Sequence, residues 1–213
     1  MIPRVLHQIW FGGKPVSAMS DLNKKCLESI VDILPDYQYN LWDDSHGMKV
    51  PWVKRALEGG HICAACNYFR IWKLHEVGGV YVDTDVQMLR PFDLAPACFI
   101  GFQREDTEKD CINTAVMGCV PGNRFAKSLL AAYEGVDPSE GCISMGCTIP
   151  TALLFIAGMD GLNVTQRVGD IEVFAREYFH PRCWMDRSKN YATGKTVCIH
   201  HFEGSWLFYR SHI

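Results

Sequence analysis

Two aspartates separated by a single residue, Asp83 and Asp85, are the side chains whose type and spacing best suit metal chemistry in this sequence. They directly follow an apolar run, residues 80–82, which is itself preceded by two glycines. An unpaired carboxylate buried inside a strand is costly or becomes neutral, so we expect this pair at the carboxyl end of the strand. There their oxygens can bind Mg²⁺ or Mn²⁺ together with substrate phosphates and water. An isolated pair of this kind is usually a solvated turn, but the strand and glycines before it favour a site.

The elements that must position these acids alternate between strand and helix patterns. Strand patterns cover residues 5–10, 37–42, 80–82, 98–102, 114–118, 163–168 and 196–200. Helix patterns cover residues 22–34, 62–77, 124–134 and 151–157, with Ser20 as an N-cap and Pro35 as a stop for the first of them. This order predicts an α/β fold with a largely parallel central sheet flanked by helices on both faces. Ligands bind at the carboxyl ends of the strands in such sheets.

Length and composition indicate one compact unit. The chain has 213 residues, of which 48% are hydrophobic and 21% are charged, and it shows no repeat or linker, so we expect a single domain, 1–213. A net charge of −3 argues against a nucleic-acid partner. Ten scattered cysteines are interpreted as reduced thiols. No leader or membrane-spanning run is evident, which predicts a cytoplasmic location.

A resemblance to a known family covers the same region. The run from Ala64 to Arg70, continued through Leu74, Glu76 and residues 78–85, resembles the D-x-D sugar-binding region of glycosyltransferase family 32. Its members include yeast initiating mannosyltransferases, bacterial capsule and lipopolysaccharide glycosyltransferases, and the catalytic domains of clostridial glucosylating toxins. The opening, residues 2–12, and the ending, residues 200–206, resemble that family as well.

The resemblance implies a GT-A type nucleotide-diphospho-sugar transferase fold and a single catalytic domain. It also implies retaining transfer of a hexosyl unit from a nucleotide sugar to a glycan or lipid-linked saccharide acceptor, as in polysaccharide biosynthesis. UDP-hexose is the favoured donor and GDP-mannose the second choice, with Mn²⁺ or Mg²⁺ as the cofactor. The missing membrane anchor is compatible with a soluble acceptor or with transient association at the inner face of a membrane.

Position by position, the resemblance also assigns roles to single residues. Asp85 is expected to bind the metal directly, while Asp83 supports the metal shell and contacts the ribose or the donor sugar. Arg70 is expected to bind sugar hydroxyls or phosphate, and it shares a helix face with Asn67. The family pattern usually has aspartate at the position of Asn67, so this difference leaves the donor preference and the rate open.

Both ends of the chain are expected to complete the site. His7, Trp10 and Phe11 are predicted to line the nucleotide pocket, with Trp10 stacked on the base. Ser205 and Trp206 resemble a segment that closes over the donor. A histidine just before them, His200 or His201, is expected as the third metal ligand. Neighbouring residues on a strand point in opposite directions, so only one can reach the cation, and His201 is favoured.

Two other functions remain open. Residues 82–86 also look like the first motif of haloacid-dehalogenase phosphatases, but Phe174 stands where the later acid of that family is expected. A sugar-nucleotide-binding module without turnover is the non-enzymatic alternative, and Asn67 is its main support. Asp85→Ala combined with a panel of sugar nucleotides distinguishes these functions from transfer.

Overall fold

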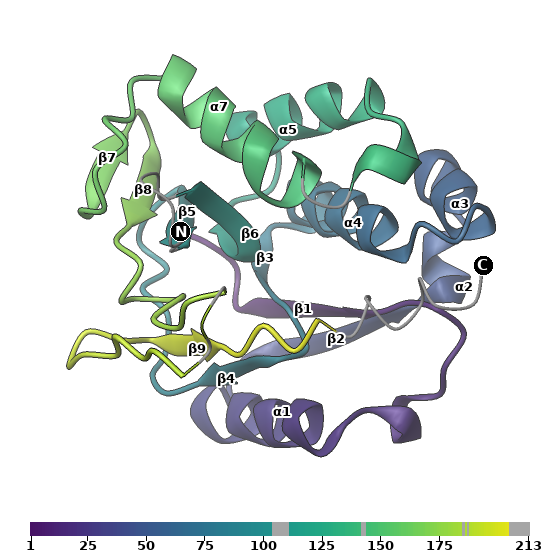
Figure 1. Ribbon diagram of the computed structural model, residues 1–213, viewed down its shortest axis with the longest axis horizontal. Coiled ribbons are helices and arrows are strands. Elements are labelled where there is room, and N and C mark those ends of the chain that lie inside the picture. Colours follow the sequence, from purple (N-terminus) through teal and green to yellow (C-terminus); the bar gives the residue numbers. More distant parts are fainter. Residues whose placement is uncertain (104–110, 142–143, 185, 187, 205–213) are drawn as a thin grey trace.

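The computed structural model describes residues 1–103, 111–141, 144–184, 186 and 188–204, and its centre is a seven-stranded sheet (Figure 1). The strand order in this sheet is β2-β1-β3-β6-β5-β8-β7, and β4 and β9 form a separate two-stranded sheet. The strands are β1 (Val5–Trp10), β2 (Gln38–Asp43), β3 (Gly79–Val82), β4 (Val86–Met88), β5 (Cys98–Gln103), β6 (Cys111–Cys119), β7 (Gln166–Val168), β8 (Ile171–Phe174) and β9 (Cys198–His200).

Most of the large sheet runs in one direction. The parallel strands are β2, β1, β3, β5 and β8, while β6 and β7 run in the opposite direction. The prediction of a largely parallel α/β sheet is therefore confirmed, with antiparallel β6 inserted between β3 and β5. Because β1, β2 and β3 are parallel, their carboxyl ends meet at one edge of the sheet. Asp83 follows β3 at that edge.

Helices cover both faces of the sheet, as predicted. Figure 1 shows α3, α4, α5 and α7 above the strands, and α1 with the β4–β9 pair below them. The α-helices are α1 (Asp21–Ile33), α2 (Asp44–Gly47), α3 (Pro51–Glu58), α4 (Ile62–Val77), α5 (Arg124–Glu134) and α7 (Ile149–Ile156). Shorter turns are η1 (Val16–Ala18), η2 (Pro138–Glu140) and the π-helical turn η3 (Ser144–Thr148).

Each face of the sheet has its own apolar core. Successive side chains of a strand point to opposite faces, so Tyr81 of β3 packs with α4 and α5 while Val80 and Val82 pack with α1 and β4. All three β3 side chains are buried. The strand before the two aspartates is thus fixed by packing on both of its faces.

Local signals explain the helix that borders the site and the helix below the sheet. The hydroxyl of Ser20 accepts a hydrogen bond from the Asn23 amide at 3.1 Å, which confirms the predicted N-cap of α1. Helix α4 ends at Gly78, whose φ of 70° suits glycine. The chain then enters β3 directly, so α4 and β3 are held in a fixed relation.

Some sequence expectations differ from the structure. The strand predicted over 163–168 begins only at Gln166, since the side chains of Asn163 and Thr165, and not their backbone, accept the amides that follow β8. Helix α3 was not predicted, and Pro51 occupies its first turn, where proline needs no hydrogen-bonded N–H. Cys63 is disulfide-bonded, so the expectation of ten reduced thiols is wrong for this residue. None of the described helices is long and apolar enough to cross a membrane.

Candidate active site

The turn after β3 is held by backbone and side-chain hydrogen bonds. The Asp83 amide donates to the Ala115 carbonyl at 2.9 Å, and the Val86 amide donates back to the Asp83 carbonyl at 3.1 Å. The side chain of Gln8 on β1 also donates to the Asp83 carbonyl, at 3.2 Å. These bonds fix the backbone on both sides of Asp85, so the two carboxylates leave the strand end in defined directions.

Arg70 and Tyr81 orient the first carboxylate. An Arg70 guanidinium nitrogen lies 2.9 Å from Asp83 Oδ1, and the Tyr81 hydroxyl donates to the same oxygen at 2.6 Å. The guanidinium also lies over the Tyr81 ring, 4.5 Å from its centroid. Burial opposes the positive charge of Arg70, but Asp83 outweighs burial and raises the pKa of this group. Arg70 therefore stays cationic beside the acids, and Oδ2 of Asp83 takes no part in these two contacts.

His200 joins the two aspartates in one cluster. Its Nε2 lies 3.4 Å from Asp85 Oδ1 and 3.8 Å from Asp83 Oδ2. The Glu203 amide donates to the other oxygen of Asp85 at 2.7 Å. Burial disfavours a charged Asp85, but the His200 imidazole and the Glu203 amide outweigh burial and lower the Asp85 pKa to about 2. Asp85 is therefore an ionised, nearly buried carboxylate at neutral pH.

The histidine that reaches the acids is His200, so the preference for His201 is corrected. β9 pairs with β4 in a register that places His200 opposite Val86, directly after the acidic turn. The next side chain points elsewhere, and His201 Nε2 lies 3.1 Å from Gln87 Oε1. The expectation that only one of the two neighbours faces the acids follows from strand geometry, whereas the identity of that neighbour depends on the pairing register.

A pocket of about 380 Å³ opens beside this cluster. Its wall includes most of the residues singled out in the sequence: Trp10, Phe11, Asn67, Arg70, Asp83 and Asp85. The Asn67 side chain is 3% exposed and its amide nitrogen lies 3.4 Å from the Gly141 carbonyl. The expected gathering of α4, β3 and the end of β1 around one cavity is thus observed.

His7 lies away from this wall, which corrects its expected place in the nucleotide pocket. It is 1% exposed, and it is absent from the described residues that line the cavity. Its Nε2 lies 2.9 Å from the Gly78 carbonyl and its Nδ1 accepts the Trp42 indole N–H at 3.1 Å. His7 therefore links β1 to the end of α4 and to β2. Ser205 and Trp206 lie outside the described residues.

The loop after β1 is fixed by Asp44. Its carboxylate accepts hydrogen bonds from the Gly12 amide at 3.0 Å and from the Gly13 amide at 2.9 Å. The Trp10 indole donates to the Lys14 carbonyl at 3.0 Å. These contacts hold in place the loop that follows Trp10 and Phe11, two of the residues that line the pocket.

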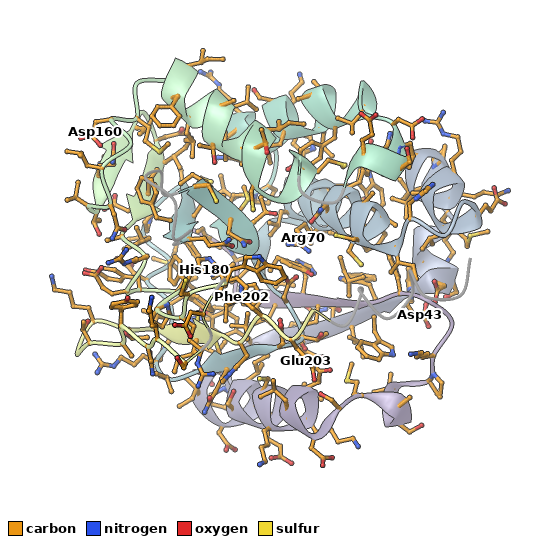
Figure 2. The ribbon with its side chains drawn as sticks, in the orientation of Figure 1. Asp43, Arg70, Asp160, His180, Phe202 and Glu203 are labelled. Atoms are coloured by element: carbon orange, nitrogen blue, oxygen red, sulfur yellow. The ribbon has the colours of Figure 1, made fainter. Side chains whose placement is uncertain are left out.

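Several side chains of the pocket had no assigned role in the sequence, among them Gln103, Trp184 and Glu203. Gln103 and Trp184 line the cavity, and Glu203 does so with a buried carboxylate oxygen that has no hydrogen-bond partner in the described chain. Figure 2 places Arg70, His180, Phe202 and Glu203 between the helical layers, whereas Asp43 and Asp160 lie at the periphery. Glu203 belongs to the C-terminal run that resembles the family, which was the available signal for it.

The acidic cluster fits a divalent cation. One atom from each of Asp83, Asp85 and His200 can be chosen so that all three lie within 4.8 Å of one another. Two ligands at about 2.1 Å from a common ion can be up to about 4 Å apart, so the 3.4 and 3.8 Å separations are compatible with shared coordination. Carboxylate oxygens with one imidazole suit Mn²⁺ well and Mg²⁺ less so.

Comparison with known proteins finds similarity in the region around these acids. Residues 20–100 match a family described as a glycosyltransferase sugar-binding region containing a DXD motif. An inositol phosphoceramide mannosyltransferase 3 of Schizosaccharomyces pombe is 27% identical over 130 residues, covering 58% of this chain and 35% of that protein. The mannosyl phosphorylinositol ceramide synthase SUR1 of Saccharomyces cerevisiae is 29% identical over 143 residues, covering 64% and 36%. The chain thus spans about a third of the length of these relatives.

Two solved structures share the fold at low identity. The PaToxG glycosyltransferase superposes with a TM-score of 0.58 at 18% identity, over 73% of this chain and 69% of that one. A glycosyltransferase involved in glycosylation of the major capsid of PBCV-1 superposes with a TM-score of 0.54 at 12% identity, over 99% and 100%. The predicted GT-A type fold is confirmed, and so is the resemblance to the D-x-D region of family 32. Residues 20–100 of this chain are therefore similar to the DXD-containing sugar-binding region of glycosyltransferases.

Proposed function

We propose that the chain is a metal-dependent glycosyltransferase that moves a hexosyl unit from a nucleotide-sugar donor to a glycan or lipid-linked saccharide. The observation that supports this most is the cluster of Asp83, Asp85 and His200 in the wall of a pocket that aromatic residues also line. A cavity of about 380 Å³ is within the range of small-ligand sites.

The donor is proposed to lie with its diphosphate at the acidic cluster and its base near Trp10 and Phe11. Indole and phenyl rings stack on a base of any kind, so these residues supply affinity without choosing between uracil and guanine. The side chains of Asn67 and Arg70 face the same cavity from α4. They are placed to hydrogen-bond sugar hydroxyls or a phosphate oxygen between the two ends.

Breaking the sugar–phosphate bond places additional negative charge on the departing diphosphate. A cation held by Asp83, Asp85 and His200 would stabilise that charge as a Lewis acid. Arg70 contributes a fixed positive charge 2.9 Å from Asp83, which limits repulsion between the acids and an anionic donor. Retention at the anomeric carbon is proposed from the family resemblance, and NMR of the product anomer tests it.

Mannose is the first sugar to test. The two curated relatives are named for mannosyl transfer involving inositol phosphoceramide, which favours a GDP-mannose donor and a lipid-linked acceptor over the UDP-hexose favoured by the sequence. Both donor types belong in the assay. A phosphatase remains the less favoured alternative, because Phe174 stands where the later acid of the haloacid-dehalogenase family is expected.

The central experiment measures binding and turnover separately. Calorimetry with GDP and UDP, each with and without Mn²⁺, measures binding, and release of sugar from GDP-mannose, UDP-glucose, UDP-galactose and UDP-N-acetylglucosamine measures turnover. Asp85→Asn removes one ligand charge while keeping the side-chain volume. We expect it to lower Mn²⁺-dependent nucleotide affinity and sugar release by about 100-fold or more, since even residues behind the ligands typically contribute 10- to 100-fold.

The matched control is Asp32→Asn, the same substitution at an exposed position of α1. It should leave binding and turnover unchanged. Nucleotide binding with Mn²⁺ but no sugar release or transfer from any donor would instead identify a binding module, in agreement with Asn67 replacing the usual aspartate. Steady release of phosphate from simple phosphate esters would instead support the phosphatase alternative over transfer.

A further inference from the structure

His180 contacts the cluster from behind and has no role in the function proposed above. It follows β8, is completely buried, and its ring centroid lies 5.3 Å from that of His200 and 6.3 Å from that of Phe202. Its Nδ1 lies 3.3 Å from Nδ1 of His200. Its Nε2 is buried without a hydrogen-bond partner among the described residues. Figure 2 shows His180 beside Phe202 in the interior of the molecule.

This environment is a poor one for a histidine that serves only packing. A buried polar atom without a partner costs free energy, and an apolar side chain of similar volume would avoid that cost. The single side-chain hydrogen bond of His180 among the described residues goes to His200. The presence of an imidazole at this position is therefore explained by what it does for His200 rather than by the stability of the core.

The two facing Nδ1 atoms can share only one proton. Their 3.3 Å separation fits a single N–H···N hydrogen bond, in which one Nδ1 carries the proton and donates and the other accepts with its lone pair. If His200 donates from Nδ1 to His180, Nε2 of His200 keeps its lone pair and faces Asp83 and Asp85. If His180 donates instead, a neutral His200 has its proton on Nε2 and cannot bind a cation there.

We propose that His180 is a positioning residue that accepts the Nδ1–H of His200 and thereby holds His200 in the tautomer whose Nε2 can bind a cation. The second nitrogen of a metal-binding histidine commonly donates to a carboxylate or a backbone carbonyl. Here the acceptor is a neutral imidazole, which orients the ring without adding a negative charge to a site that already has two. This inference depends on the metal site of the proposed function.

Two substitutions separate positioning from packing. His180→Leu fills the space but removes the acceptor, whereas His180→Asn keeps a side-chain oxygen near the place of Nδ1. Titration calorimetry of each full-length variant with MnCl₂ in the absence of any nucleotide gives the metal affinity, and urea unfolding gives the stability. We expect His180→Leu to lower Mn²⁺ affinity by about 10- to 100-fold with unchanged or increased stability, and His180→Asn to stay within about threefold of wild type.

NMR gives a readout that does not depend on the variants folding. Long-range ¹H–¹⁵N correlation spectra of wild-type protein with Mg²⁺ should show His200 protonated at Nδ1. An Nε2–H tautomer in the metal-loaded state, or wild-type Mn²⁺ affinity in His180→Leu, overturns the inference. Wild-type protein that binds Mn²⁺ while Asp85→Asn does not, together with either of those results, removes only the role of His180. Absence of Mn²⁺ binding in wild type removes the proposed metal site itself.

Discussion

At the scale of single residues, Arg70 organises the acidic end of the pocket. It is 6% exposed, touches Asp83, and lies over the ring of Tyr81. A buried ion pair of this kind adds little net stability, but loss of one partner leaves the charge of the other uncompensated. The arrangement therefore fixes the direction of the Asp83 side chain, and replacement of either Arg70 or Asp83 alone is expected to destabilise the protein.

A double-mutant cycle measures this coupling. Arg70→Met should destabilise the protein by about 2–3 kcal/mol, less than for a fully buried pair because the Asp83 side chain is 26% exposed. Asp83→Asn should recover about 1–2 kcal/mol of that loss in the double variant, since no unpaired charge then remains. Urea unfolding of the four proteins without metal gives the cycle.

An exposed pair provides the control for the cycle. Lys54 and Glu58 on α3 lie 3.8 Å apart with half-exposed side chains, so their coupling should be about 0.5 kcal/mol or less. Strict additivity between the Arg70 and Asp83 substitutions would mean that water already screens the buried pair and would contradict its orienting role.

At the scale of elements, the close approach of β1 and β3 depends on Gly79. This residue has a φ of 105°, and an added Cβ would lie 2.5 Å from the Val5 carbonyl oxygen. A backbone atom within a sheet cannot move aside as a flexible side chain can. The glycine that begins β3 therefore sets the distance between the strand that delivers the aspartates and the strand that delivers Trp10.

Alanine substitutions at two glycines distinguish the steric contact at Gly79 from backbone strain. Gly158 has a φ of 103° and nothing within 4 Å of an added Cβ, so Gly158→Ala should cost only the strain, about 1–2 kcal/mol. Gly79→Ala should cost about 2 kcal/mol more because it also pushes β3 from β1. Urea denaturation of both variants compares them, and equal losses would exclude the steric contribution at Gly79.

Some of these elements can be predicted from the sequence, and others cannot. The strand end with Asp83 and Asp85 can be predicted from a local pattern, because its apolar residues, glycines and acids are adjacent along the chain. The choice of His200 is not local, since it depends on which residue of β9 faces Val86 across a pairing between distant segments. Helix α3 was not predicted, because a proline such as Pro51 is typical both of the first turn of a helix and of a loop. Gln103 and Trp184 reach the pocket only through tertiary packing.

At the scale of the whole molecule, the pocket joins parts of the fold that are remote in sequence. Residues of β1, α4, β3 and the segment after β9 all line it. A ligand that contacts several of these parts at once must stabilise their common arrangement, because it binds the folded state and not the unfolded chain. Stability is therefore expected to depend on ligand and metal together.

Thermal unfolding tests this dependence. At a nucleoside diphosphate concentration of about 100 times Kd with saturating Mn²⁺, stabilisation is about 2.7 kcal/mol. For a domain of this size that corresponds to a rise in Tm of roughly 5–10 °C. EDTA should abolish the rise caused by nucleotide, and so should Asp85→Asn. A Tm increase with nucleotide that EDTA leaves intact would mean that the nucleotide binds without the acidic cluster.

The hydrogen bond from the Glu203 amide to Asp85 joins residues 118 positions apart. During synthesis from the amino terminus, a growing polypeptide therefore contains both aspartates long before the histidine and the amide that complete their surroundings exist. Contacts of such long range form late and slow folding. The acidic turn of the nascent chain thus lacks its later contacts, and the proposed metal site can be assembled only after synthesis has reached His200 and Glu203.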